Sequence, residues 1–221
     1  MKVVGLLNLF DSPSLGNLTK TRTLASTSFL GRFTPMDFAL SNFANSGIDG
    51  INILIKDNFR SVAKHVGSIK SWVNNTKIDR QNLLINEKGM IDPEENTDIN
   101  CLKENDWVLF QAKADVVVIQ PAHIISTINL KNIVREHYEK GRDITVVYKH
   151  ITDAKEAFRG SNVLTVENGK VVKSVANNGR KNEADVSLET YIISMDYIRK
   201  HASEYLGQPT VNSFKKVIQY I

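Results

Sequence analysis

This 221-residue sequence has little cysteine, little net charge and no long apolar run, and each of these absences excludes a class of protein. A single cysteine, Cys101, excludes an internal disulfide framework and fits a reducing compartment. The formal net charge is only +4 and the basic residues are scattered, so a nucleic-acid partner is not expected. No apolar run approaches the roughly 18–20 residues that span a bilayer, and the first ten residues lack a signal-peptide cleavage site. We therefore expect a cytoplasmic protein that has no membrane partner.

Apolar runs of strand length alternate with helical stretches, which is typical of a parallel or mostly parallel sheet flanked by helices. The predicted strands of this sheet cover residues 3–9, 50–55, 115–119 and 144–148. Further along, Asn168 and Gly169 separate two strand-like runs and predict a hairpin, because this pair tolerates the positive φ angles of a tight turn. Residues 187–194 predict one more strand, which with the hairpin indicates an antiparallel addition to the sheet.

Three helices are predicted from capping residues at their starts and glycines at their ends. Their limits are Thr34 and Gly47, Asp57 and Gly67, and Asn129 and Gly141. In the first helix a proline takes the first position and Asp37 the third, where a carboxylate completes a capping box. The third is expected to bury Tyr138. Residues 211–221 have helical apolar spacing, and residues 23–29 look strand-like.

The residues offer only a few candidates for chemistry. The loop after the first strand, residues 10–18, has one glycine and a proline, which makes it a poor phosphate loop. The five histidines show no paired metal-ligand spacing. The acidic stretch of Asp92, Glu94, Glu95 and Asp98 is expected to be a solvated loop. Arg22 and Arg32 are candidates to hold phosphate oxygens; the alternative is that they are surface arginines or pair with Asp37. His123 follows a predicted strand and is a candidate to contact a ligand at the strand edge; the alternative is a structural histidine.

Residues 29–48, FLGRFTPMDFALSNFANSGI, resemble the F-G-G-[KR]-[FY]-R-x-[IL]-D-F-x-L-S-N-x-x-N-S-G-[IL] signature of the ADP-glucose pyrophosphorylases, which are glucose-1-phosphate adenylyltransferases. Residues 114–125 resemble the strand that runs into Gly-Asp-His in active members. Residues 187–197, SLETYIISMDY, resemble a later sugar-site strand, S-M-G-I-Y-x-F-x-x-x-Y.

This resemblance implies an α/β fold, a three-layer α/β/α Rossmann-like sugar-nucleotidyltransferase domain with a mixed, mostly parallel sheet. The domain is expected to span residues 1–221, without the C-terminal left-handed β-helix of the family. The family joins ATP and glucose 1-phosphate with Mg²⁺ to give ADP-glucose and pyrophosphate.

The sequence departs from the family at the positions that handle phosphate and metal in active members. The glycines and arginine of the G-G-x-G-x-R loop align with Leu9, Phe10, Ser12 and Ser14. The lysines of Ala-Lys-Pro and Glu-Lys-Pro align with Leu24 and Asn177, and the aspartates of Gly-Asp-His and Asp-Phe-Gly align with Ala122 and near Ser213. Removing one charge-stabilising contact typically costs about 2.7–4 kcal/mol in a transition state, so losses at all of these positions indicate a site without activity.

Such a pattern resembles the D-type glycogen-biosynthesis branch of the family, regulatory and largely non-catalytic subunits that pair with a catalytic subunit. The resemblance implies that this chain has no catalytic or metal-binding residues and no cofactor of its own, with Mg²⁺ in the catalytic partner. Substrate or effector binding is expected at Arg22, Arg32, His123, Glu189 and Tyr191. Two alternatives stay open: a divergent but active glucose-1-phosphate adenylyltransferase, and a non-enzymatic module that senses a nucleotide or a sugar phosphate.

Overall fold

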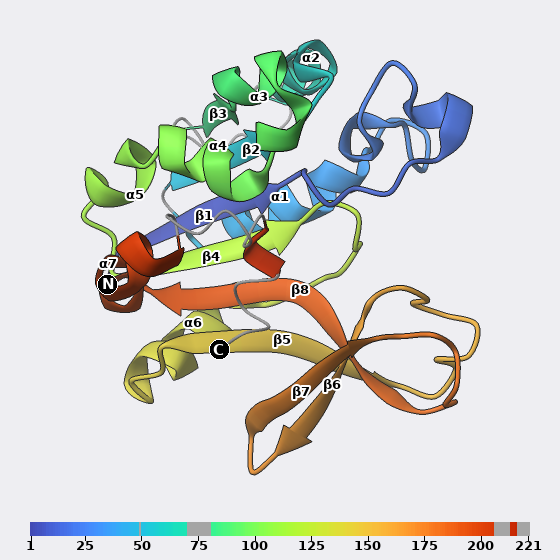
Figure 1. Cartoon of the computed structure of the whole chain (residues 1–221), viewed down its shortest axis with the longest axis vertical. Coiled ribbons are helices and arrows are strands. Elements are labelled where there is room, and N and C mark those ends of the chain that lie inside the picture. Colours follow the sequence, from blue (N-terminus) through green and yellow to red (C-terminus); the bar gives the residue numbers. More distant parts are fainter. Residues whose placement is uncertain (49, 70–80, 206–212, 216–221) are drawn as a thin grey trace.

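The computed structural model describes residues 1–48, 50–69, 81–205 and 213–215. In this part of the chain an eight-stranded sheet has the order β3-β2-β1-β4-β8-β6-β7, and β5 pairs with β8 off this path (Figure 1). The strands are β1 (Val3–Asn8), β2 (Gly50–Ile55), β3 (Gln81–Ile85), β4 (Val116–Pro121), β5 (Ile144–Ile151), β6 (Asn162–Glu167), β7 (Lys170–Ala176) and β8 (Ala184–Ser194).

The sheet has a parallel core and an antiparallel extension. Strand β1 runs parallel to β2 on one side and to β4 on the other, and β3 runs parallel to β2. Strand β8 is antiparallel to β4, β5 and β6. The near-continuous Val, Ile and Leu runs of β1, β2 and β4 are buried, as expected of strands that are covered on both faces. The predicted mixed α/β fold is therefore confirmed.

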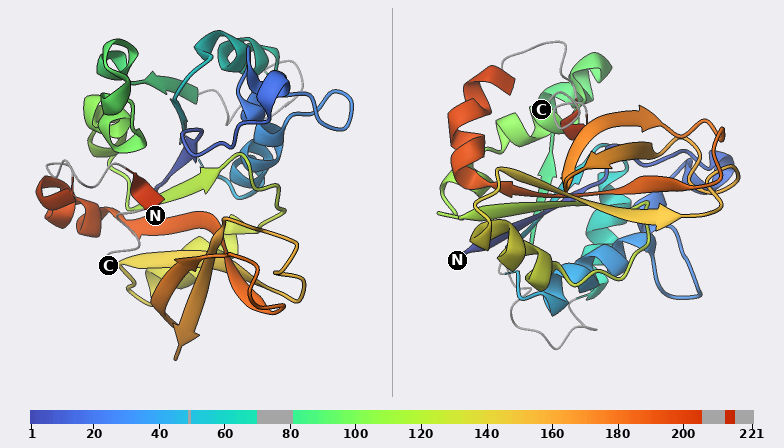
Figure 2. Two further views of the ribbon diagram at one scale, coloured as in Figure 1. Left: turned by 45° about the vertical axis from the view of Figure 1, so that its right-hand side comes forward. Right: turned by 90° about the horizontal axis from the view of Figure 1, so that it is seen from below.

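Helices cover both faces of the sheet and complete three layers (Figure 2). On one face, α1 (Pro35–Asn45), α2 (Phe59–Ile69) and α6 (Leu130–Glu139) contribute Phe43, Val62 and Leu130 to a cluster that includes Ile53 and Val118 of the strands. On the other face lie α4 (Asp98–Glu104), α5 (Trp107–Phe110) and α7 (Met195–Tyr205), and their buried side chains pack on the opposite side of the same strands. The described helices include none that is long and apolar enough to cross a membrane.

The start of α1 follows the predicted capping pattern. The backbone N–H of Thr34 donates to Oδ2 of Asp37 at 2.7 Å, and Pro35 occupies the first helical position. Gly47 follows the helix with a φ of +71°, the left-handed conformation that glycine adopts at helix ends. Asp37 pairs with His65, whose Nε2 lies 2.7 Å from Oδ1, and the ion pairs of the described residues include none between Asp37 and an arginine. Burial opposes ionisation of Asp37, but the bonds from His65 and Thr34 hold its pKa below the usual value.

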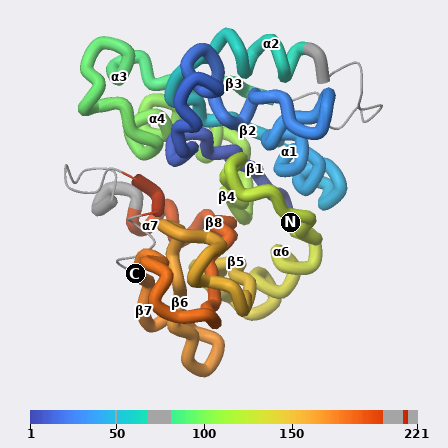
Figure 3. The backbone as a smooth tube through the Cα atoms, turned by 90° about the vertical axis from the view of Figure 1, so that its right-hand side faces the viewer, coloured from blue at the N-terminus to red at the C-terminus, as the bar shows by residue number. Residues whose placement is uncertain are grey.

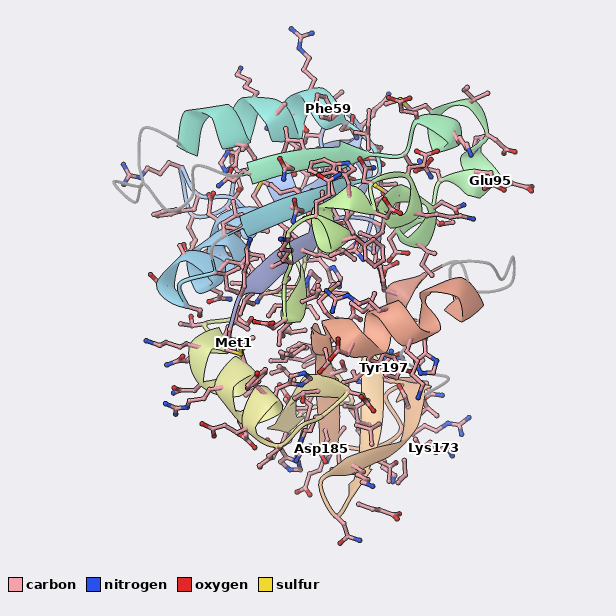
Figure 4. All side chains as sticks on the ribbon, turned by 90° about the vertical axis from the view of Figure 1, so that its left-hand side faces the viewer. Met1, Phe59, Glu95, Lys173, Asp185 and Tyr197 are labelled. Carbon is pink, nitrogen blue, oxygen red and sulfur yellow. The ribbon has the colours of Figure 1, made fainter. Side chains whose placement is uncertain are left out.

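The predicted hairpin is present as β6 and β7. Asn168 and Gly169 have φ angles of +50° and +73°, which match the tight turn that the pair predicts. The hairpin lies at the far end of the molecule from the parallel strands (Figure 3). Lys173 on β7 and Asp185 on β8 lie near one end of the molecule, and Phe59 and Glu95 near the other (Figure 4).

Several predictions about local structure were wrong. Helix α2 continues through Gly67 to Ile69, because glycine alone does not end a helix whose apolar face still packs on the sheet. Residues 23–29 form no strand but contain a short 3₁₀ helix, η2 (Leu24–Ser26), and Tyr138 is 59% exposed. Most of residues 211–221, for which a helix is predicted, lie outside the described residues.

The prediction for one acidic residue, Asp98, was also wrong. Asp92, Glu94 and Glu95 are exposed as expected, but Asp98 is the first residue of α4 and is 1% exposed. Its burial is possible because two N–H groups from distant segments donate to its carboxylate, as described below.

Candidate functional site

The carboxyl ends of β1 and β4 meet at one edge of the sheet. Asn8 at the end of β1 is in register with Pro121 at the end of β4, so the segments that follow, with Asp11 and His123, leave the sheet together. Strand β8 arrives from the opposite direction, and its Tyr191 is in register with Ile119. In open α/β sheets ligands bind outside the carboxyl ends of the parallel strands, so this edge is the candidate site.

Glu189 on β8 is the centre of this edge. Its side chain is buried, and its carboxylate contacts side chains from two other segments: Nε2 of His123 lies 3.3 Å from Oε2, and Nζ of Lys215 contacts Oε1. Figure 1 shows the segment 213–215, in red, beside β4 and β8. Burial opposes ionisation of Glu189, but its bonds to His123 and Lys215 hold the pKa below the usual value. Glu189 is therefore an ionised, buried carboxylate.

A second buried carboxylate, Asp98, joins three segments of the chain. Nδ2 of Asn8 donates to Oδ2 of Asp98 at 2.8 Å, and the backbone N–H of Phe214 donates to the same oxygen at 3.2 Å. Burial, and then the charge of Asp11, raise the pKa of Asp98 to about 7. The surrounding protein, and then the charge of Glu189, also raise the pKa of Asp11. This edge thus holds three coupled carboxyl groups, balanced by Lys215, His123 and Lys56.

Three of the five residues for which binding was predicted come together here. Tyr191 is buried beside Glu189, and burial followed by that charge raises the pKa of its hydroxyl. His123 keeps one nitrogen, Nδ1, buried and without a hydrogen-bond partner among the described residues. Arg22 and Arg32, by contrast, are exposed on the loop between β1 and α1, where the guanidinium of Arg32 lies 5.5 Å from the ring centre of Phe33. That these five residues bind a ligand stays a prediction.

Helix α1 positions the loop that carries His123. Asn42 is buried, its Nδ2 donates to the carbonyl oxygen of Ser126 at 3.0 Å, and its Oδ1 accepts from the N–H of Ile128 at 3.2 Å. Asn42 thus bonds two backbone groups of the loop between β4 and α6. Residues 29–48, which contain Asn42, therefore hold the loop between β4 and α6 that carries His123.

Comparison with known proteins places these observations in a family. The model of a family described as nucleotidyl transferase matches residues 14–174. The chain belongs to this family. It is similar to glycogen biosynthesis protein GlgD from Bacillus subtilis (27% identity over 62% of this chain and 40% of that protein) and from Geobacillus stearothermophilus (29%, 61% and 39%). It is also similar to the glucose-1-phosphate adenylyltransferase of Thermotoga neapolitana, at 24% identity over 88% of this chain and 46% of that enzyme.

These matches confirm the predicted kinship with the ADP-glucose pyrophosphorylases. The chain spans less than half the length of these curated relatives.

The aligned positions of the nucleotidyl transferase site hold side chains of a different character. Ala122, directly after β4, is 1% exposed and presents a methyl group at the position that the resemblance aligns with the family's aspartate. Asn177 is buried, and its amide donates to the carbonyl oxygens of Ala154, Ala157 and Phe158 at 2.8–3.1 Å. This amide orders the loop between β5 and β6, a structural role for which the aligned lysine would be unsuited.

The side chains at this edge do not fit an Mg²⁺ ion of the kind the family uses. Mg²⁺ requires carboxylate oxygens in near-octahedral geometry, and Ala122 supplies none. Asp98 and Glu189 accept hydrogen bonds from Asn8, Phe214 and Lys215. Across the described ranges, no group of three or more His, Cys, Asp or Glu side chains is placed to hold a metal.

Sequence reasoning missed Asp11, Asp98 and Lys215. The polar residues around Asp98 in the sequence predict a solvated loop, and its partner Asn8 is 90 positions away in the sequence. The one usable signal for Lys215 was its place two residues after Ser213, near which the aspartate of Asp-Phe-Gly aligns.

Proposed function

We propose that this protein is a regulatory, largely non-catalytic subunit that binds a catalytic glucose-1-phosphate adenylyltransferase and modulates ADP-glucose synthesis in glycogen biosynthesis. The observation that carries the proposal is Ala122, buried at the end of β4 where the family's metal-binding aspartate would lie. Nucleotidyl transfer depends on positioning and on neutralising phosphate charge, and a methyl group supplies neither.

The remaining charged groups of this edge support the same proposal. Glu189 and Lys215 contact each other, and Asp98 is held by Asn8 and Phe214. Side chains that are hydrogen-bonded to one another in this way stabilise the fold instead of presenting free charges to ATP or a metal. We place the catalytic Mg²⁺ in the partner subunit and the complex in the cytoplasm.

Similarity to two kinds of relative supports a paired role. Some relatives carry the name glycogen biosynthesis protein GlgD and others glucose-1-phosphate adenylyltransferase. A chain that keeps the nucleotidyl transferase fold but not its charged site is suited to contacting a homologous subunit through the shared architecture.

Mixing the chain with the catalytic adenylyltransferase of its own organism tests the proposal. ADP-glucose formation from ATP, glucose 1-phosphate and Mg²⁺ is measured for the catalytic subunit alone, for this chain alone and for the mixture. We expect no product from this chain alone, and an effect on the rate or effector response of the mixture of about fivefold or more. Heat-denatured chain is the control, and co-elution of the two proteins gives the physical readout.

Two results would overturn the proposal. Product formed by this chain alone, dependent on Mg²⁺, would establish the alternative of a divergent active enzyme. A mixture that neither co-elutes nor differs in rate would exclude the regulatory role.

A sensing module is the second candidate, favoured by the convergence of His123, Glu189 and Tyr191 on one edge. Calorimetric titration with ATP and with ADP-glucose, with and without Mg²⁺, distinguishes it. Binding that is independent of Mg²⁺ would support a sensor, provided that the catalytic subunit is unaffected by the chain.

A further inference from the structure

Glu189 has a backbone conformation that its residue type disfavours. Its φ is +50°, in the left-handed region, although the residue is only 5% exposed and lies inside β8. A non-glycine residue there costs about 1–2 kcal/mol and persists only when its surroundings hold it in place. Here the N–H of Glu189 donates to Oγ of Ser187 at 3.1 Å, and the carboxylate is held by its contacts with His123 and Lys215.

The two charged partners Glu189 and Lys215 stand where the family motifs have glycine. The strand motif S-M-G-I-Y places its glycine on residue 189 of SLETY, and Asp-Phe-Gly places its glycine on residue 215 of Ser-Phe-Lys. In the structure these two side chains meet. Because glycine has no side chain, the ion pair fills space that the motifs leave open.

The groups that contact the Glu189 carboxylate form an anion-binding arrangement. Lys215 supplies an ammonium group and His123 a ring nitrogen, and both contact carboxylate oxygens. The opposing charges are those of Asp11 and of Asp98, which burial makes reluctant to ionise. Without Glu189, the arrangement would retain Lys215 and His123 around the vacated position.

We propose that His123 and Lys215 form a binding place for one phosphate group, and that the chain's own Glu189 carboxylate occupies this place and blocks it. A carboxylate and a phosphate present the same kind of anionic oxygen to such donors, and lysine binds phosphate as a compact point charge. The ligand class is thus a phosphate monoester or free phosphate, which enters only when Glu189 is displaced. The inference rests on the proposed function and deepens it, because a blocked phosphate place would keep substrate out of a non-catalytic subunit.

Replacement of Glu189 by a short, neutral residue tests the inference. Glu189→Asn and Glu189→Gly both suit a positive φ, so both are expected to fold, which circular dichroism checks. Titration calorimetry with inorganic phosphate and with glucose 1-phosphate is carried out on the full chain, without a partner. We expect each variant to bind phosphate about tenfold or more tightly than the wild type.

Two controls separate site occupancy from a general charge effect. Glu183→Asn removes one negative charge from an exposed position before β8 and is expected to leave phosphate binding at the wild-type level. Adding Lys215→Met to Glu189→Asn is expected to abolish the gain, because the ammonium donor is lost. Equal affinity for the two probes identifies free phosphate as sufficient, and tighter binding of glucose 1-phosphate shows that the sugar also contacts the site.

The inference is overturned if folded Glu189→Asn and Glu189→Gly bind phosphate no more tightly than the wild type, or if the Lys215→Met double variant keeps the gain. Because the titrations use this chain alone, such a result leaves the effect on a catalytic subunit untouched. Conversely, a chain that fails to affect the catalytic subunit can still show the gain in phosphate binding.

Discussion

The side-chain amide of Asn8 donates a hydrogen bond to the buried carboxylate of Asp98 at 2.8 Å, and this bond joins the end of β1 to the start of α4. The bond connects the strand that leads into the candidate site with a helix that begins 90 positions later in the sequence. The same carboxylate accepts from Phe214, so one buried acid organises three segments. The protonation of Asp98 is therefore coupled to the stability of the site.

Stability is expected to fall as pH rises through the titration of Asp98. The pKa is about 7 in the folded chain against 3.8 for the ordinary side chain, so between these values the folded state binds the proton that the unfolded state has lost. The corresponding loss, about three pH units at 1.36 kcal/mol each, is on the order of 4 kcal/mol between pH 4 and pH 7. Asp98→Asn, which mimics the protonated acid, removes this dependence.

Urea unfolding of wild type and Asp98→Asn at pH 5 and pH 8 measures the difference. The variant is expected to gain stability over the wild type as pH rises. Asp106→Asn, at an exposed position on the same face, serves as the control. A variant that keeps the wild-type pH profile would contradict the assignment to Asp98.

Asn42→Ala is expected to lower the free energy of unfolding by about 1–2 kcal/mol, because it leaves two partly buried backbone groups of the β4–α6 loop without the partners that Asn42 provides. Asn45→Ala on the same helix removes an exposed amide and should change stability by about 0.5 kcal/mol or less. Denaturant titration of both variants makes the comparison. Equal effects would show that Asn42 does not hold the loop.

The parallel core and the hairpin could be predicted because their signals are local. Strands β1, β2 and β4 are continuous apolar runs, and Asn168 and Gly169 specify their turn by backbone preference alone. Strand β3 was missed, because it is an edge strand with two polar residues, and its Asn82 donates to Asn52 of β2 at 2.8 Å. No local pattern in residues 81–85 predicts pairing with a strand 30 positions away.

The candidate site was predictable only in part. His123, Glu189 and Tyr191 follow from their strands, since the register places the carboxyl end of β4 beside Tyr191 of β8. The Asn8–Asp98 and Glu189–Lys215 contacts join residues 90 and 26 positions apart, and no local pattern encodes them. Arg22 and Arg32 looked suitable by type, but the loop between β1 and α1 leaves both exposed.

Cys101 is expected to resist thiol reagents in the folded protein. It is fully buried in α4, and burial raises the pKa of its thiol to about 12, so the reactive thiolate is scarce. Labelling with a chromogenic disulfide should be complete in urea and slow in buffer. A cysteine introduced at exposed Ser28 in a Cys101→Ser background should react at once. Rapid labelling of native Cys101 would mean that α4 opens readily.

Two glycines should respond in opposite directions to alanine. At Gly89 in α3 (Glu87–Ile91), an added Cβ would lie 2.7 Å from the Cα of Asn96, so the backbone must shift and stability should fall by about 1–3 kcal/mol. Gly67 lies within α2 with open space around its Cβ position, and alanine there should add about 0.5–1 kcal/mol through helix propensity. Thermal unfolding of the two variants measures both signs. A stabilising Gly89→Ala would show that the turn after α3 is not packed against this residue, and with it that the segment leading to Asp98 is held less tightly than its hydrogen bonds indicate.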